Sequence, residues 1–102
     1  MEVRAEDIDT IDLKVGETLD LESLRAAVTP SQLLLIPFVE TPRGIDVDGQ
    51  EALGEDGVHG SLFHLAAREP GEGQLVVGFK DLRTNQVTRR KAIRVAVHDA
   101  KR

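Results

Sequence analysis

Apolar and polar residues alternate along the segment 61–79, on both sides of a Pro-Gly pair. A repeat of two residues is typical of a half-buried strand rather than a helix. Pro70 fixes its own φ and lacks an N–H, while Gly71 and Gly73 tolerate positive φ, so we expect the chain to reverse there. The segment therefore predicts two strands joined by a short turn.

The same alternation predicts further strands before and after this segment. They are expected at Ile8 to Val15, Thr18 to Glu22, Gln32 to Glu40, briefly at Ile45 and Val47, and at Gln86 to Asp99. Ile8 is off the parity of its strand, which indicates a bulge or a switch of sheet near Asp9 and Thr10. A helical turn or an irregular loop is expected over 22–28, and a long polar loop over 48–60.

About seven strands with turns at short intervals are typical of an all-β, immunoglobulin-like antiparallel β-sandwich. A chain of 102 residues has the usual size of one domain, so residues 1–102 are interpreted as a single sandwich. We expect Phe63, Phe79 and Val95 to share its core.

The segment from Leu33 to Val39 is apolar at both parities. One face of a strand in a two-layer sandwich meets water, so the second apolar face must be covered by a loop of the same chain or by another protein. Pro37 cannot donate a ladder hydrogen bond, which places the strand at an edge or a bulge. Both covers stay open, and Leu33, Leu35 and Val39 are the candidate residues for a homodimer or partner interface.

The chain has no cysteine, which excludes disulfides and thiolate metal sites. It has no run of about 20 apolar residues, so no membrane partner is expected. The net charge is -5, but residues 1–57 hold fourteen acids and four bases, whereas residues 58–102 hold four acids and nine bases. Either two faces of opposite sign orient a charged partner, or acidic strands lie beside basic ones and cancel locally. Neither composition nor charge indicates a compartment.

Candidate catalytic residues are few. His59, His64 and His98 have no metal-ligand spacing, and none of the three serines lies in a G-x-S-x-G motif. No glycine-rich phosphate motif is present. We therefore expect no enzyme activity, no metal centre and no cofactor.

Asp46, Asp48 and Glu51 offer carboxylate oxygens, the ligands that calcium prefers. Their spacing departs from the EF-hand loop, because Gly49 directly follows the second aspartate. The acidic stretch from Asp46 to Asp56 is interpreted as a solvated loop, with a calcium site as the open alternative.

The basic cluster of the sequence consists of Arg89, Arg90, Lys91 and Arg94. Alternation sends Arg90 and Arg94 to one face of the strand and the other two residues to the opposite face. No aromatic residue lies between them for base stacking, so we expect no nucleic-acid partner. Protection of a strand edge and pairing with the acidic first half explain the cluster better.

Two stretches, Asp12 to Leu19 and Phe63 to Phe79, resemble chagasin-type cysteine-protease inhibitors and related bacterial immunoglobulin-like domains. The order of elements fits this resemblance along most of the chain. It implies a β-sandwich that presents three loops to the active site of a papain-like protease. In that family the loops carry motifs of the N-P-T-T-G, G-x-G-G and R-P-W types.

Three segments of this chain stand at the corresponding positions. They are Thr29, Pro30, Ser31 and Gln32; Gly57, Val58, His59 and Gly60; and Leu82, Arg83, Thr84 and Asn85. The first keeps a proline and a hydroxyl but not the asparagine or the glycine. The second has a histidine where a glycine is expected, and the third lacks proline and tryptophan. The resemblance makes these segments the candidate protein-binding loops.

The sequence as a whole favours a non-enzymatic protein-binding or assembly module on a β-sandwich scaffold, because fold analogy alone does not assign a function. The alternative is a diverged chagasin-like inhibitor of papain-like cysteine proteases that uses the three loops. An inhibition assay against such proteases separates the two.

Overall fold

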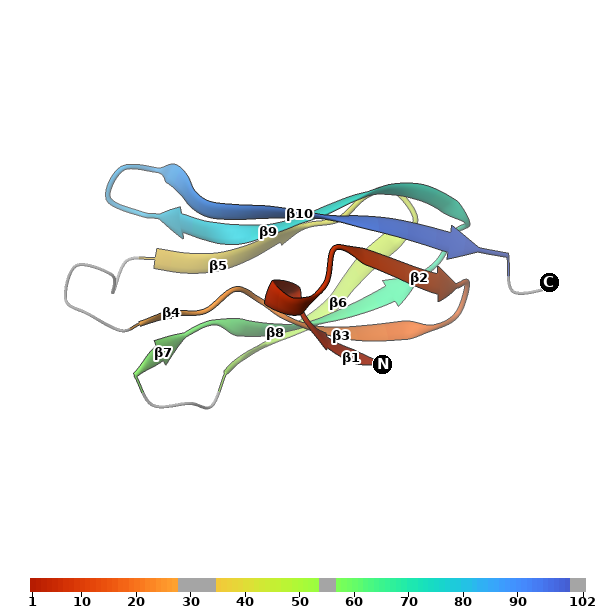
Figure 1. The fold of residues 1–102 in the computed structure, drawn as a ribbon, viewed down its shortest axis with the longest axis horizontal. Coiled ribbons are helices and arrows are strands. Elements are labelled where there is room, and N and C mark those ends of the chain that lie inside the picture. The colour runs from red at the N-terminus through yellow and green to blue at the C-terminus, as the bar shows by residue number, and fades with distance from the viewer. Residues whose placement is uncertain (28–34, 54–56, 100–102) are drawn as a thin grey trace.

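Two β-sheets lie face to face in the computed structural model, which describes residues 1–27, 35–53 and 57–99 (Figure 1). The elements in chain order are β1 (Glu2–Arg4), the 3-10 helix η1 (Ala5–Asp7), β2 (Thr10–Lys14), β3 (Thr18–Glu22), β4 (Ala26–Ala27), β5 (Leu35–Glu40), β6 (Ile45–Ala52), β7 (Val58–His59), β8 (Ser61–Ala67), β9 (Gly71–Asp81) and β10 (Gln86–His98). Seven strands of the described chain have five residues or more, and the predicted all-β sandwich is confirmed. No helix among the described residues is long and apolar enough to cross a membrane.

The described strands form two four-stranded sheets and a two-stranded pair. Sheet A has the order β1-β3-β8-β6, sheet B has the order β2-β10-β9-β5, and β4 pairs with β7. The pairs β1–β3 and β2–β10 are parallel, so the sandwich is mixed at its N-terminal edge rather than wholly antiparallel. The reason is η1, which reverses the chain and carries it from sheet A to sheet B (Figure 1). Of the two predicted alternatives, a bulge or a switch of sheet near Asp9 and Thr10, the structure shows a switch, which lies slightly earlier, at η1.

β6 is longer than the sequence pattern predicts. The pattern indicates a brief strand at Ile45 and Val47 and a polar loop from residue 48 onward, but β6 continues to Ala52 along β8. The loop prediction is wrong because β6 is an edge strand, held by backbone bonds to one neighbour while most of its side chains face water. A strand of this kind leaves little hydrophobic alternation to detect.

The Pro-Gly turn joins the two sheets instead of two paired strands. β8 lies in sheet A and β9 in sheet B, so the reversal at Pro70 carries the chain across the sandwich. Gly44 supports this crossing with φ +93° and with its carbonyl oxygen, which accepts the N–H of Arg68 at 2.7 Å. A Cβ on Gly44 would lie 2.8 Å from the backbone oxygen of Glu69, so a larger residue would displace the turn.

The core lies between the sheets and is built from the inward-facing rows that the alternation predicts. Its largest fully buried side chains are Phe63, Phe79, Leu13, Leu19, Leu21, Leu65, Leu75, Ile93, Val77 and Val95. Phe63, Phe79 and Val95 belong to one hydrophobic cluster, as expected. Removal of these rows from water is the main favourable contribution to folding.

β5 forms the outer edge of sheet B beside β9. The edge position that Pro37 predicts is confirmed. Leu35 and Val39 pack against the core, whereas Ile36 faces outward and is 44% exposed. Leu33 lies outside the described residues, and a homodimer through this strand stays a prediction.

Candidate protein-binding site

The connections that carry the three candidate loops leave the sandwich at the same end (Figure 1). β4 ends at Ala27, β5 begins at Leu35, β7 begins at Val58, and the turn from β9 to β10 spans residues 82–85. Residues 29–32 lie outside the described part of the chain. The structure thus gathers the second and third candidate loops and the strands that flank the first at one end, called the loop end below.

Backbone pairing ties the bases of the three connections to one another. Ala26 pairs with His59, which joins the first connection to the second. Leu35 pairs with Asp81, which joins the first connection to the third. A fixed scaffold of this kind holds the bases of surface loops in place.

One carboxylate holds the turn between β9 and β10. The guanidinium of Arg83 donates from Nη2 to Asp81 Oδ2 at 3.1 Å, and its backbone N–H donates to Oδ1 at 2.9 Å. The guanidinium bond and then the backbone bond lower the pKa of Asp81 below its usual value. Asn85 has φ +59°, a left-handed conformation that asparagine tolerates, and donates its N–H to the Asp81 carbonyl oxygen at 2.7 Å. Leu82 stands next to this ordered backbone and is 53% exposed.

Glycine shapes the second connection at both ends of β7. Gly57 has φ +77°, in the region that favours glycine. A Cβ on Gly60 would lie 2.5 Å from Leu53 Cδ1, so a larger residue at this position would displace the Leu53 side chain. Between them His59 is half-buried, and its Nε2 is buried without a hydrogen-bond partner among the residues that the structure describes.

A bulge in β10 connects the two sides of the loop end. The register with β9 shifts between Thr88 and Lys91, where Arg89 has φ +50°. Arg89 donates from Nη1 to the carbonyl oxygen of Arg25, and its guanidinium carbon lies 5.9 Å from the centre of the Phe79 ring. Sequence reasoning missed this link, because an arginine in a left-handed conformation leaves no periodic signal.

The acidic stretch of β6 does not converge on one point. The Arg68 guanidinium lies 3.5 Å from Asp46 Oδ2 and 3.1 Å from Asp48 Oδ2, whereas Glu51 Oε2 lies 3.1 Å from His64 Nε2. Over residues 1–27, 35–53 and 57–99, no group of His, Cys, Asp or Glu side chains is placed to hold a metal ion. These acids act as partners of neighbouring strands in the described structure.

His64 is a link across the outer face of sheet A. Its Nδ1 lies 2.7 Å from Asp20 Oδ1 on β3, and its Nε2 lies 3.1 Å from Glu51 Oε2 on β6. The hydrogen bond to Asp20, and then that to Glu51, raises the pKa of His64 above its ordinary value. The two carboxylates bind opposite nitrogens of the ring, so this group joins three strands instead of forming a site. His98 likewise lies beside a carboxylate, with Nε2 3.2 Å from Asp12 Oδ1.

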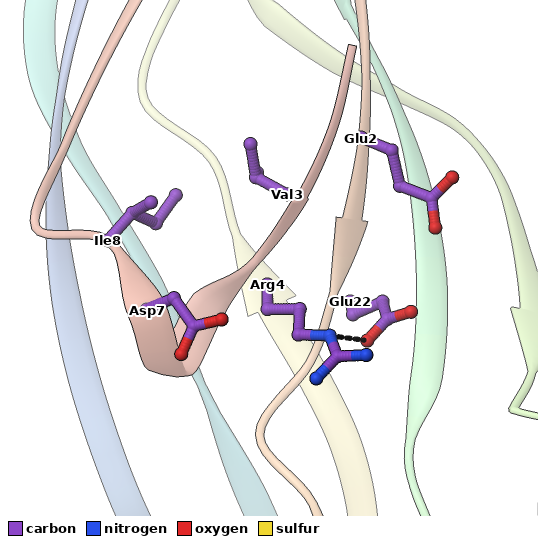
Figure 2. A pocket seen from close by; sticks show the side chains of 6 residues that line it. All are labelled: Glu2, Val3, Arg4, Asp7, Ile8 and Glu22. Atoms are coloured by element: carbon purple, nitrogen blue, oxygen red, sulfur yellow. Dashed lines mark ion pairs between the residues drawn. The ribbon is translucent and has the colours of Figure 1, made fainter.

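A shallow hollow of about 370 Å³ lies beside β1 and η1 (Figure 2). It is lined by Glu2, Val3, Arg4, Asp7, Ile8 and Glu22. Val3 and Ile8 pack against the core, and Arg4 Nε lies 3.3 Å from Glu22 Oε2. The hollow marks the place where the chain changes sheet, and we interpret it as part of the scaffold.

Two solved structures share this β-sandwich fold over nearly the whole chain. The crystal structure of the cysteine protease inhibitor EhICP2 from Entamoeba histolytica matches 95% of this chain and 93% of that chain, with a TM-score of 0.71 and 11% sequence identity. The solution structure of amebosin matches 97% of this chain and 96% of that chain, with a TM-score of 0.66 and 13% identity. No protein-family model and no curated protein matches the chain. The TM-scores establish a shared fold, and sequence identities this low establish nothing beyond the fold.

Proposed function

We propose that this protein binds papain-like cysteine proteases through the loop end and blocks their active-site cleft without acting as an enzyme. The observation that carries the proposal is that the strands bounding the three connections lie at one end of the sandwich, where β4 pairs with β7 and β5 pairs with β9. Structural similarity to a cysteine protease inhibitor over 95% of this chain supports the proposal. It favours inhibition over the broader expectation of a binding or assembly module.

Binding in a cleft requires loops that lose little conformational freedom when they are covered. The third connection meets this requirement, because Asp81 accepts hydrogen bonds from both the backbone and the side chain of Arg83. Leu82 then offers an apolar side chain on ordered backbone. Burial of its exposed half contributes about 1 kcal/mol, which corresponds to roughly fivefold to tenfold in affinity.

The test compares substitutions of two exposed apolar residues. Leu82→Asp alters the third connection, whereas Val47→Asp alters the edge strand β6, where Val47 is 45% exposed. Wild-type protein and Val47→Asp are expected to inhibit a papain-like protease equally, and Leu82→Asp is expected to raise the inhibition constant about tenfold or more. Inhibition constants are measured from hydrolysis of a fluorogenic peptide, and far-UV circular dichroism establishes that the variants are folded.

Two results contradict the proposal. One is the absence of inhibition by the wild-type protein at high micromolar concentration across a set of papain-like proteases. The other is an equal loss of inhibition in both variants, since Val47 lies near the start of β6, away from the third connection.

A further inference from the structure

An exposed apolar row crosses the outer face of sheet B next to the third connection. Ile36, Lys80 and Val87 lie side by side in register on β5, β9 and β10. Ile36 is 44% exposed and Val87 is 49% exposed, and Leu82 in the adjoining turn is 53% exposed. Three of the five large hydrophobic residues that are exposed in the described chain therefore lie at this end of sheet B.

The same surface holds cations without carboxylate partners. The side chains of Lys80 and Arg90 take part in no ion pair or hydrogen bond within the part of the chain that the structure describes. Arg89 is not part of this surface, because its guanidinium donates to the carbonyl oxygen of Arg25 and lies 5.9 Å from the ring centre of the buried Phe79. By contrast, Arg68 and Arg83 each face carboxylates of the same chain.

This grouping of side chains does not stabilise the sandwich. Like charges near one another on a sheet repel, and apolar side chains that face water contribute no burial. The face is nevertheless ordered, because the ring of Phe38 covers Gly78, where a Cβ would lie 3.0 Å from Phe38 Cε1. A partner that covers the face explains an arrangement that costs the free protein stability.

We infer that this surface, defined as Ile36, Lys80, Val87 and Arg90 and called the basic shoulder, contacts an acidic rim with apolar residues beside the cleft of the bound protease. The inference rests on the proposed function and narrows it to the papain-like proteases whose rim is negatively charged on this side. Cations that have no internal partner attract carboxylates of the partner, and the apolar neighbours exclude water from the contacts. Attraction of this kind raises the association rate more than the final affinity.

The test uses two double charge reversals on the same face of the same sheet. Lys80→Glu/Arg90→Glu changes the basic shoulder. Lys14→Glu/Arg94→Glu is the matched control on β2 and the second half of β10, away from the third connection, where both residues are exposed and point outward. Each double variant makes the net charge more negative by the same amount, so the comparison isolates position from total charge. Association rates are measured with two papain-like proteases that carry opposite net charge beside their clefts.

The shoulder variant is expected to associate with the acidic-rim protease about tenfold more slowly than wild-type protein at low salt, and the control variant within about twofold. The difference is expected to shrink to about twofold or less at 0.5 M NaCl, where screening is strong. The protease with the basic rim is expected to associate more slowly with wild-type protein than with the shoulder variant.

Equal slowing by both double variants, or equal rates for all three proteins, overturns the inference and leaves the proposed function standing. A wild-type protein that inhibits neither protease removes the proposed function and the inference with it. Thermal unfolding by far-UV circular dichroism verifies that both variants are folded, since the chain has no tryptophan or tyrosine to report on tertiary structure.

Discussion

The outer faces of the two sheets differ in how their charges are satisfied. On sheet A, His64 lies between Asp20 and Glu51, and Arg68 lies beside Asp48. Each of these contacts joins neighbouring strands, so the charges of sheet A are partners of one another. Exposed pairs of this kind stabilise a fold only slightly, but they fix which side chains lie together.

On sheet B, near the loop end, Lys80 and Arg90 face water without a carboxylate in the described structure. Exposed Ile36 and Val87 lie beside them. The charged side chains at the centre of sheet A therefore find partners within the chain, whereas the described part of sheet B near the loop end has charges and apolar area that a partner can cover.

Removal of one buried aromatic ring from each sheet tests whether the two sheets contribute equally to the core but differently to protease binding. Phe63 of sheet A and Phe79 of sheet B are at most 2% exposed. Phe63→Ala and Phe79→Ala are each expected to lower the free energy of unfolding by about 3–5 kcal/mol, measured by urea denaturation. Only Phe79→Ala also removes the ring beside Arg89, so the corresponding leucine variants, which stay folded, should differ in protease inhibition. Equal inhibition by Phe63→Leu and Phe79→Leu would contradict the difference in role.

Two glycines on the outer faces provide a closer comparison. A Cβ on Gly78 of sheet B would lie 3.0 Å from Phe38 Cε1 and from the carbonyl oxygen of Arg89, whereas a Cβ on Gly49 of sheet A would lie 3.3 Å from His64 Cδ2. Gly78→Ala is expected to cost about 1–3 kcal/mol of unfolding free energy through overpacking. Gly49→Ala should change it by less than about 0.5 kcal/mol, because the imidazole can move and alanine suits a strand better than glycine. Urea denaturation of the two variants measures which one loses more unfolding free energy. A larger loss in Gly49→Ala than in Gly78→Ala would contradict the prediction.

The inner rows of the sandwich are predicted well by the sequence, and the reason is burial. Ile93, Val95 and Val97 are buried and the residues between them are not, because one face of β10 meets the core, and the period of two records this. The edge position of β5 is likewise predictable, since Pro37 lacks the donor that an inner strand needs. The position of a residue can therefore be predicted from the hydrophobic pattern of the sequence when that position depends on burial.

The loop end is predicted only in part. The resemblance locates the connections, but the details come from hydrogen bonds with no periodicity, such as those from Arg83 to Asp81. The left-handed Arg89 and the strand from Asp48 to Ala52 are invisible for the same reason, because backbone geometry rather than hydropathy places them. Charge pairs across strands, such as His64 with Asp20, need the register before they can be recognised.

The His64 contacts on sheet A predict a pH dependence of stability. The pKa of His64 is raised in the folded protein, chiefly by the hydrogen bond to Asp20 and next by that to Glu51. Its contribution to stability is therefore full below the unfolded pKa of 6.5 and is lost as the pH rises through the folded pKa. His64→Gln should flatten the decline in urea midpoint above pH 6.5, and Asp20→Asn should flatten it more than Glu51→Gln. If the urea midpoint of His64→Gln depends on pH as strongly as that of the wild-type protein, then the contacts of His64 with Asp20 and Glu51 do not stabilise its protonated form.

Asp81→Asn at the loop end is expected to change the free energy of unfolding least. Its main expected effect is on the motion of the neighbouring turn. Asp81 has a pKa below its usual value because of the Arg83 guanidinium, so its contribution is present above pH 3.8 and is lost as the pH falls through the folded pKa. The amide keeps the size of the carboxylate but weakens the hold on Arg83. Nuclear spin relaxation of residues 82–85 should show increased motion, with weaker protease inhibition and little change in unfolding midpoint. Asp46→Asn, which weakens an exposed pair with Arg68 on sheet A, is the matched control and should leave inhibition unchanged. If both variants leave the turn and the inhibition as they were, then the paired charges of the loop end are no more important for binding than those of sheet A, and the contrast between the faces reduces to the unpaired cations alone.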